Sequence, residues 1–314
     1  MRQLILLVLC LPGFLCLSLA ADLKVGIVGT DTSHVTAFTK LLNDASAPGY
    51  IPGARVVAAY KGGSPDLQSS ASRVEGFAKE LQEKWQVEIV PDIPTLCSKA
   101  DAVLLESVDG RVHLEQARQI IAARKPLFID KPLASTLQDA REIARLAREA
   151  GVPWFTSSSL RWSDIVTQLA GPGITGLLVW GPGPLEEHHQ LDLAWYAIHP
   201  IEMLYALFGP GCQEVTRIYS EGADIVVGRW KDGRLGVVRA IRPYGDYGAV
   251  VYRGEKSFRS SPDAKHDYRP LVVEIVKFFQ TGKPPVPNEE SLEMFAFMDA
   301  AQRSKPDGKP VKLQ

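Results

Sequence analysis

The sequence predicts an α/β fold with two parts: an N-terminal Rossmann-like, doubly wound parallel sheet, and a C-terminal α+β domain with an open, mainly antiparallel sheet. From residue 23 to about residue 158, short continuous apolar runs alternate with helical patterns, which is typical of a parallel sheet covered on both faces. After Arg161, strand-like runs follow one another without helices between them, which is typical of an antiparallel sheet. The predicted domains are therefore residues 22–158 and 159–314.

The elements of the first domain follow from hydrophobic periodicity. Apolar residues at helical spacing predict four helices, and short β-rich runs predict six strands. The strands are expected at residues 23–29, 55–60, 87–90, 102–107, 126–130 and 153–157, and the helices at 33–43, 69–85, 112–123 and 137–150.

The second domain shows four strand-like runs, VTRIYSEG, DIVVGRW, RLGVVRAI and GAVVYRG. Asp232-Gly233 between two of them is a strong signal for a tight hairpin turn. Two helices, at about residues 268–280 and 291–303, are expected to close the chain, with the last helix free to pack back on the first domain.

Composition limits the class of protein. Of the 314 residues, 46% are hydrophobic and 23% are charged, and the net charge is −1, so the chain is globular rather than disordered. A sequence pI near 6.6 gives no basic excess for neutralising phosphates, so we expect no nucleic-acid partner.

The first 21 residues are expected to be a signal peptide. Arg2 precedes an apolar run that ends in Ser18-Leu19-Ala20-Ala21, and this pattern is typical of secretory signals. The alternative is an N-terminal membrane anchor, but Pro12-Gly13 interrupts the run and its length is at the lower limit for spanning. We therefore expect an exported protein, periplasmic or secreted, with no membrane contact beyond the cleaved signal.

Two cysteines, Cys97 and Cys212, remain after the signal. Their spacing fits neither a disulfide framework nor a metal knuckle. Each is expected to be a small buried apolar residue, with a single bridge between them as the alternative.

The turn after the first strand, GIVGTDTSHV, stands where a dinucleotide fold has G-x-G-x-x-G. Only Gly29 matches, and Asp31 and His34 replace the other two glycines. Asp31, Thr32 and Ser33 are all good N-cap residues, so the anion site at this helix start is expected to be filled from within.

Two further motifs carry titratable side chains. In IDKPLAST, Lys131 follows the end of a parallel strand, where doubly wound folds bind ligands. In LDLAWYAIHPIEMLYALFG, His199 lies at the start of an apolar helix. A solvated lysine and a core histidine are the plainer alternatives for the two.

Together these motifs, with SVDGRVH at residues 107–113, resemble the Gfo/Idh/MocA oxidoreductases over nearly all of the mature chain. The resemblance implies hydride transfer between NAD or NADP and a carbohydrate hydroxyl, in a cleft between the domains, and a possible homo-oligomer through the C-terminal sheet. By carry-over, the catalytic residues are Lys131 and His199. The implied cofactor-binding residues are Gly29, Thr30, Asp31, Thr32, Ser33, His34, Lys61, Ser107 and His113. The implied substrate-binding residues are Arg161, Trp162, Trp195 and Tyr196.

Departures from the family pattern keep a second function open. Trp195 stands where the family has an aspartate four residues before the histidine, and Lys61 stands near the usual acidic residue for the ribose. The Trp195 departure puts proton transfer in doubt, and Lys61 favours a 2′-phosphate or, alternatively, is a solvent-facing loop residue. Asp31 in the glycine loop and the export signal favour a redox-inactive or cofactor-poor relative, such as a carbohydrate-binding protein or a lyase. The segment EEHHQLD, with His188, His189 and Asp192, is expected to be a polar cleft rim, and we expect no metal site.

Overall fold

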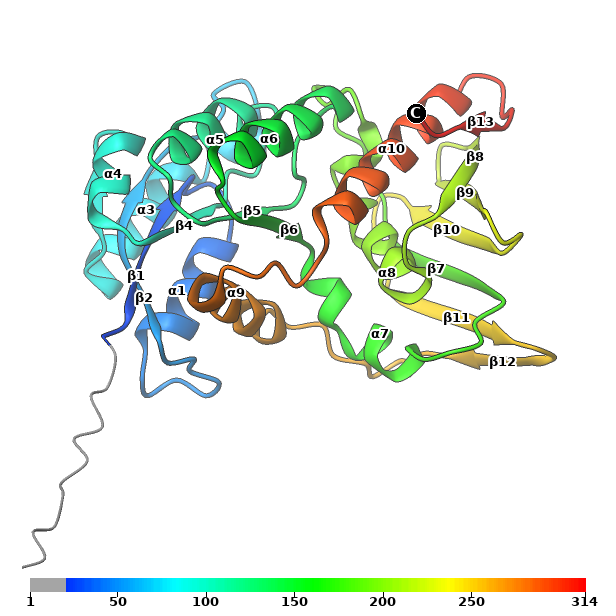
Figure 1. Cartoon of the computed structure of the whole chain (residues 1–314), viewed down its shortest axis with the longest axis horizontal. Helices are drawn as coiled ribbons and strands as arrows, with labels where there is room; N and C mark the ends of the chain where they lie inside the picture. The colour runs from blue at the N-terminus through cyan, green and yellow to red at the C-terminus, as the bar shows by residue number, and fades with distance from the viewer. Residues whose placement is uncertain (1–20) are drawn as a thin grey trace, which may run out of the picture.

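The structure is a computed structural model that describes residues 21–314, so the predicted signal peptide lies, but for Ala21, outside the described residues. Figure 1 shows two halves side by side, one built on a six-stranded sheet and the other on a seven-stranded sheet. The predicted fold class is confirmed.

The first sheet is parallel throughout, with strand order β3-β2-β1-β4-β5-β6. This is the order of the doubly wound dinucleotide fold. Its ligand crevice lies at the carboxyl ends of the strands where the order reverses, which here is between β1 and β4. The strands are β1 (Leu23–Val28), β2 (Ala54–Tyr60), β3 (Glu88–Val90), β4 (Ala102–Leu105), β5 (Leu127–Asp130) and β6 (Trp154–Ser157).

Helices cover both faces of this sheet. The helix expected at residues 69–85 is two helices, because the backbone turns at Ser72 and Arg73 and the Ser72 hydroxyl donates back to the Gln68 carbonyl. A further helix, α4, was not predicted; Asp92 caps it by accepting from the Thr95 N–H. The helices are α1 (His34–Asn43), α2 (Gln68–Ala71), α3 (Val74–Trp85), α4 (Ile93–Lys99), α5 (His113–Ala122) and α6 (Leu137–Ala150).

The second sheet is mixed and mainly antiparallel, with order β12-β11-β7-β10-β9-β8-β13. Among the described strands of this second sheet, only the β7–β10 pair is parallel, and β7 was not predicted. The expected hairpin joins β9 and β10, with Gly233 at φ +86° in its turn. The strands are β7 (Gly176–Pro182), β8 (Cys212–Tyr219), β9 (Ala223–Trp230), β10 (Leu235–Ile241), β11 (Gly248–Arg253), β12 (Lys256–Arg259) and β13 (Val311–Lys312).

Of the four α-helices that the structure describes after β6, two pack on the second sheet and two contact the first half. α8 (Ile198–Phe208) packs on β7 and β10, and α7 (Asp164–Leu169) packs on β11. α9 (Arg269–Thr281) returns to the first sheet, where Leu271 and Ile275 share a buried cluster with Phe38 of α1 and Phe128 of β5. α10 (Asn288–Ser304) contacts α6 and β6 as well as β8. The returning helices therefore join the two halves (Figure 1).

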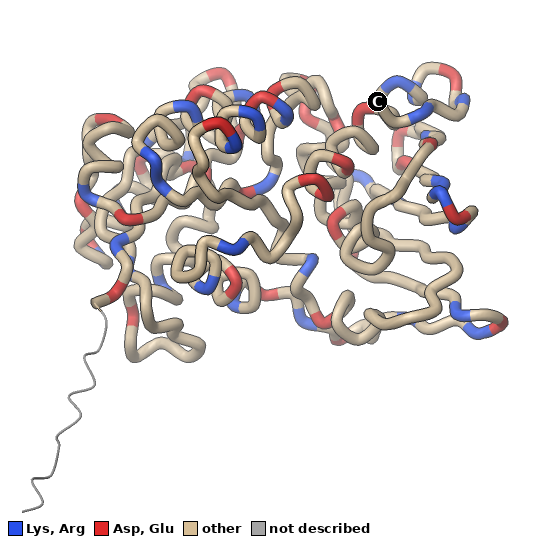
Figure 2. The backbone as a smooth tube through the Cα atoms, in the orientation of Figure 1, with Lys and Arg blue, Asp and Glu red and all other residues tan. Residues whose placement is uncertain are grey.

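Charge and cysteine positions agree with a globular surface and core. Figure 2 shows basic and acidic positions interspersed over both halves. Within residues 21–314, no helix combines the length and the apolar character that a membrane crossing needs. Cys97 and Cys212 are both free and buried, so the alternative of a bridge between them is not realised.

Candidate functional site

A cleft of about 400 Å³ lies between the two halves, at the carboxyl edge of the parallel sheet. The first half contributes the start of α1, the α2–α3 turn and the ends of β4 and β5, and the second half contributes mainly aromatic and histidine side chains. The lining residues are Thr32, Ser33, His34, Ser69, Arg73, Val108, Lys131, Ser159, Leu160, Trp195, Tyr196, His199, Tyr244, Tyr247, His266 and Tyr268.

The structure brings part of the predicted site together in this cleft. The predicted residues that line it are Thr32, Ser33, His34, Lys131, Trp195, Tyr196 and His199. The predicted residues that do not line it are Gly29, Thr30, Asp31, Lys61, Ser107, His113, Arg161 and Trp162.

His199 begins α8 and is buried at the cleft wall. Its Nδ1 lies 2.6 Å from the Ser158 hydroxyl oxygen, so Nε2 is the ring nitrogen available to a ligand. Burial, followed by the positive charge of Lys131, holds the pKa of His199 well below its usual range. The imidazole is therefore neutral at pH 7 and can accept a proton. The Ser158 hydroxyl therefore orients this imidazole.

Lys131 follows β5 and lines the same cleft. Its Nζ lies 5.9 Å from the centre of the Tyr196 ring, within cation–π range. The Trp195 ring packs edge-on against His189, at 5.2 Å between ring centroids. Lys131 is thus a cation that faces the cleft beside aromatic walls.

Asp31 does not cap its own helix, and that expectation is wrong. Its carboxylate is fully buried and accepts hydrogen bonds from the Val108 N–H at 3.0 Å and from the Ser70 hydroxyl at 2.6 Å. Thr32, not Asp31, meets the first N–H groups of α1: its hydroxyl accepts from the N–H of His34 and its carbonyl from that of Val35, both at 3.4 Å. Burial raises the pKa of Asp31, and the two hydrogen bonds partly oppose that rise. Asp31 therefore spans the crevice between the β1 and β4 loops.

The β1, β4 and β5 loops under the cleft are held together by close packing at Gly29 and by hydrogen bonds of Ser107 and His113. Gly29 has φ +92°, and a Cβ there would lie 2.4 Å from the backbone nitrogen of Ser107, so only glycine fits. The Ser107 hydroxyl donates to Gln116, and Nε2 of His113 lies 2.7 Å from the Ser107 carbonyl oxygen. Nδ1 of His113 lies 3.2 Å from the Leu133 carbonyl oxygen, so this buried ring ties the β4 loop to the β5 loop.

Thr30 in the β1 loop and Lys61 directly after β2 do not line the cleft. The Thr30 hydroxyl donates to the carbonyls of Lys61 and Val74, which ties the β1 loop to its neighbours. The Lys61 ammonium group pairs with Glu75 at 2.7 Å and is partly exposed. Both residues therefore act on the loop or at the surface rather than in the cleft.

His34, in contrast, turns its ring toward the sheet. Its Nδ1 lies 2.6 Å from Asp130 Oδ2, at the end of β5, and the ring stacks on Phe38 and packs against Tyr268. Burial opposes ionisation of Asp130, but the charge and hydrogen bond of His34 lower its pKa overall. Glu106, after β4, is fully buried beside this pair. Burial, and then the Asp130 charge, raise the pKa of Glu106 well above its usual range.

The structure places Arg161 and Trp162 away from the cleft lining. The Arg161 guanidinium pairs with Glu202 of α8 and Glu290 of α10, and all three side chains are buried or nearly so. The indole N–H of Trp162 donates to Ser157. Arg161 therefore joins the 3₁₀ turn after β6 to two helices of the second half.

The EEHHQLD segment does not bring its three candidate ligands together. His188 pairs with Glu186 at the surface, whereas His189 Nε2 lies 3.1 Å from Asp109 Oδ1 in the interior. Asp192 pairs with Arg217 and with Lys305. Through the contact of His189 with Asp109, this segment packs the second half of the molecule against the first.

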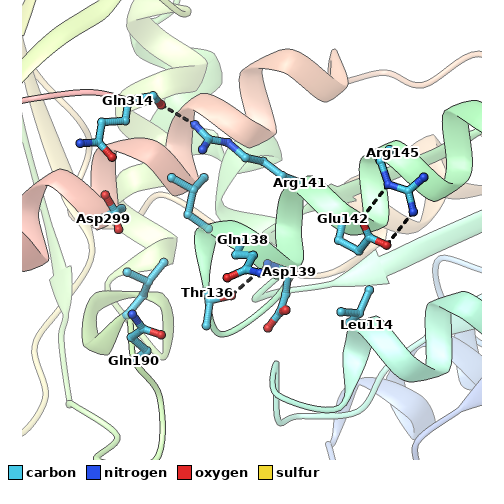
Figure 3. A pocket seen from close by; sticks show the side chains of 12 residues that line it. Leu114, Thr136, Gln138, Asp139, Arg141, Glu142, Arg145, Gln190, Asp299 and Gln314 are labelled. Atoms are coloured by element: carbon cyan, nitrogen blue, oxygen red, sulfur yellow. Dashed lines mark hydrogen bonds and ion pairs between the residues drawn. The ribbon is translucent and has the colours of Figure 1, made fainter.

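A second hollow, of about 550 Å³, is larger than the cleft but has different chemistry. It lies by α6, where Arg145 pairs with Glu142 and the Arg141 guanidinium donates to the backbone carbonyl of Gln314 (Figure 3). Most of its charged groups already have partners, and neither Lys131 nor His199 lines it. The cleft, not this hollow, is therefore the candidate site.

Comparison with known proteins agrees with the fold and the motifs. Residues 23–157 match the model of the Gfo/Idh/MocA oxidoreductase family with an NAD-binding Rossmann fold. The prediction from the motifs is confirmed.

Among curated relatives, 1,5-anhydro-D-fructose reductase of Ensifer adhaerens is 48% identical over 86 residues, 27% of this chain and 23% of that protein. Inositol 2-dehydrogenase of Paracoccus denitrificans is 32% identical over 131 residues, 41% of this chain and 34% of that protein. The matches thus span about a quarter to a third of these relatives.

Solved structures share the fold over almost the whole chain. Myo-inositol dehydrogenase from Lactobacillus casei, in complex with NAD(H) and myo-inositol, has a TM-score of 0.71 at 18% identity and covers 94% of this chain and 97% of that one. Myo-inositol 2-dehydrogenase from Lactobacillus plantarum has a TM-score of 0.74 at 15% identity, with 94% and 100% coverage.

The glycine loop does not offer the family's cradle for a dinucleotide diphosphate. Such a cradle needs a close approach of the backbone to the diphosphate at the position of Asp31, and a glycine at the position of His34 for close packing of the helix on the strand. Here the Asp31 carboxylate already accepts from the Val108 N–H inside the crevice, and the His34 ring covers Asp130. A diphosphate would also meet the negative charge of Asp31. These residues do not fit the cofactor in that position.

Several cleft residues were not predicted from the sequence. Ser69 lies on α2 and Arg73 in the turn after it, and the Ser69 hydroxyl is buried without a hydrogen-bond partner among the described residues. The second half adds Tyr244, Tyr247 and His266, from loops with no motif. Glu106 could have been singled out from the sequence, because it directly follows a wholly apolar strand and so lies at the sheet edge where ligands bind.

We expect Arg161→Leu to lower the free energy of unfolding by about 3–5 kcal/mol, because it leaves Glu202 and Glu290 buried without their cation. Arg145→Leu is the matched control, because Arg145 pairs with Glu142 and Glu149 at the surface and its loss should change stability by less than about 1 kcal/mol. Denaturant unfolding measures both. An Arg161→Leu protein of wild-type stability that no longer binds a carbohydrate would show that Arg161 contacts substrate instead.

Proposed function

We propose that the protein is a carbohydrate-acting enzyme that transfers protons to and from a sugar or cyclic polyol in the interdomain cleft. The observation that carries the proposal is the presence of Lys131 and the neutral His199 in one aromatic-lined cleft. A volume of about 400 Å³ is suitable for a small ligand. The named relatives and neighbours, which include a reductase of anhydrofructose and several inositol dehydrogenases, support a carbohydrate class of ligand.

The two side chains would have complementary roles. His199, neutral because of its burial, would take a proton from a hydroxyl group or from a carbon next to a carbonyl group, and later return it. Lys131, as a cation, would stabilise the negative charge that develops on the substrate oxygen. Tyr196 and Trp195 would supply flat apolar surfaces for a sugar ring. None of these roles needs a dinucleotide on the glycine loop.

Hydride transfer between NAD(P) and a carbohydrate hydroxyl is the second candidate. The family description and the NAD-bound neighbours favour it. The position of Asp31 disfavours it, since a second negative charge about 4 Å away costs about 4 kcal/mol at an effective dielectric constant near 20. That energy corresponds to roughly three decades in affinity.

We also propose export through residues 1–21, and a homo-oligomer formed through the seven-stranded sheet.

The test of the proposed function starts with a thermal-shift screen of monosaccharides, uronic acids and inositols. On a substrate found this way, we expect Lys131→Ala and His199→Ala each to lower turnover by about 10²–10⁴-fold, with little change in melting temperature. Lys61→Ala is the control, because Lys61 pairs with Glu75 outside the cleft.

The pH profile is a second readout of the same roles. Because burial lowers the pKa of His199, the imidazole stays unprotonated below pH 6.5, and turnover should persist there before it falls. Full activity of both alanine variants would overturn the assignment of Lys131 and His199.

Calorimetric titration with NAD(H) and NADP(H) separates the two candidates. We expect the wild-type protein to bind both only in the millimolar range or more weakly. Asp31→Gly should lose about 1–3 kcal/mol of stability, because the Val108 N–H is left buried without an acceptor. Asp31→Gly combined with His34→Gly should bind NAD at least tenfold more tightly than wild type, because both side chains leave the loop.

Tight NAD binding by the wild-type protein would contradict the proposal. Micromolar binding by the wild type that Asp31→Gly weakens would make Asp31 part of a working cofactor site. Hydride transfer would then be the function.

A further inference from the structure

Three possible metal ligands from separate elements meet at the carboxyl edge of the parallel sheet. His34 begins α1, Glu106 follows β4 and Asp130 ends β5. Nδ1 of His34 and one carboxylate oxygen from each acid all lie within 4.8 Å of one another. Strands β1, β4 and β5 are neighbours in the sheet, so the fold itself brings these three positions together.

Glu106 gives an independent indication of a ligand. Its side chain is fully buried, with 0% of its surface exposed, and neither carboxylate oxygen has a hydrogen-bond partner among the described residues. A buried carboxylate without a partner is strongly unfavourable unless it gains a proton or a cation. Lys131 lies near enough to lower the pKa of Glu106, but the described residues contain no ion pair between the two. The Glu106 carboxylate is thus suited to gain a cation as its partner.

The donor set is chemically specific. One imidazole nitrogen with two carboxylates suits divalent ions such as Mn²⁺, Fe²⁺ or Zn²⁺. Ligand atoms about 2.0–2.2 Å from one ion lie no more than roughly 4.4 Å apart, so a small rotation of the side chains would close the site. The stacking of His34 on Phe38, at 5.6 Å between centroids, holds its ring toward Asp130.

We propose that His34, Glu106 and Asp130 bind one divalent transition-metal ion at the floor of the interdomain cleft. The ion would replace the hydrogen bond between His34 and Asp130 and would give Glu106 its missing partner. His34 also lines the cleft, so the ion can enter from there and keep coordination positions open toward it. The site does not depend on the proposed carbohydrate activity.

The test is calorimetric titration of the metal-stripped full chain with Mn²⁺ and, separately, with Zn²⁺. We expect one ion per chain for at least one of the two metals, with a rise in melting temperature on binding. Glu106→Gln keeps the shape of the side chain and removes a buried charge, so the variant should fold, yet its affinity should fall by about 10–100-fold or more. Asp130→Asn should lower affinity similarly.

Glu75→Gln is the matched control, because Glu75 is an exposed carboxylate paired with Lys61. It should bind the metal like wild type. Absence of one-to-one binding for both ions would overturn the proposal, and Glu106 would then carry only a proton. Binding that Glu106→Gln and Asp130→Asn leave unchanged would overturn it as well.

Discussion

The hydrogen bond between the Asp31 carboxylate and the Val108 N–H occupies the crevice in which the site lies. It crosses the crevice between β1 and β4, where a doubly wound sheet normally receives its ligand. Because the carboxylate is buried, breaking this bond would leave a polar group unsatisfied at a cost of about 1–3 kcal/mol. The sheet thus has the strand order of a dinucleotide-binding fold, and the Asp31 and His34 side chains lie at its crevice.

Much of the fold could be predicted, because buried parallel strands are continuous apolar runs and Asp-Gly marks a hairpin. The predictions failed where local pattern is weak. β7 was missed because GLLVWGP begins with Gly and ends in Gly-Pro, which are turn residues, and its pairing with β10 and β11 comes from tertiary contacts. The return of α9 to the first sheet could not be predicted either, since its apolar face fits either half of the molecule.

The site was predicted less completely than the fold. Lys131 directly follows β5 and His199 lies in the first turn of α8, and both line the same cleft. The ion pairs of Arg161 with Glu202 and Glu290 could not be predicted, since their partners lie 41 and 129 positions away in the sequence. Asp31 was recognised as unusual, but its partners are 39 and 77 positions away, beyond the reach of a local capping argument.

The most direct test of this account is a crystal structure of the protein grown with both Zn²⁺ and NAD. The account predicts an anomalous peak about 2.0–2.2 Å from His34, Glu106 and Asp130, with Asp31 still bonded to the Val108 N–H and no dinucleotide over residues 29–34. A diphosphate bound at the start of α1, with the Asp31 carboxylate turned away, would contradict it.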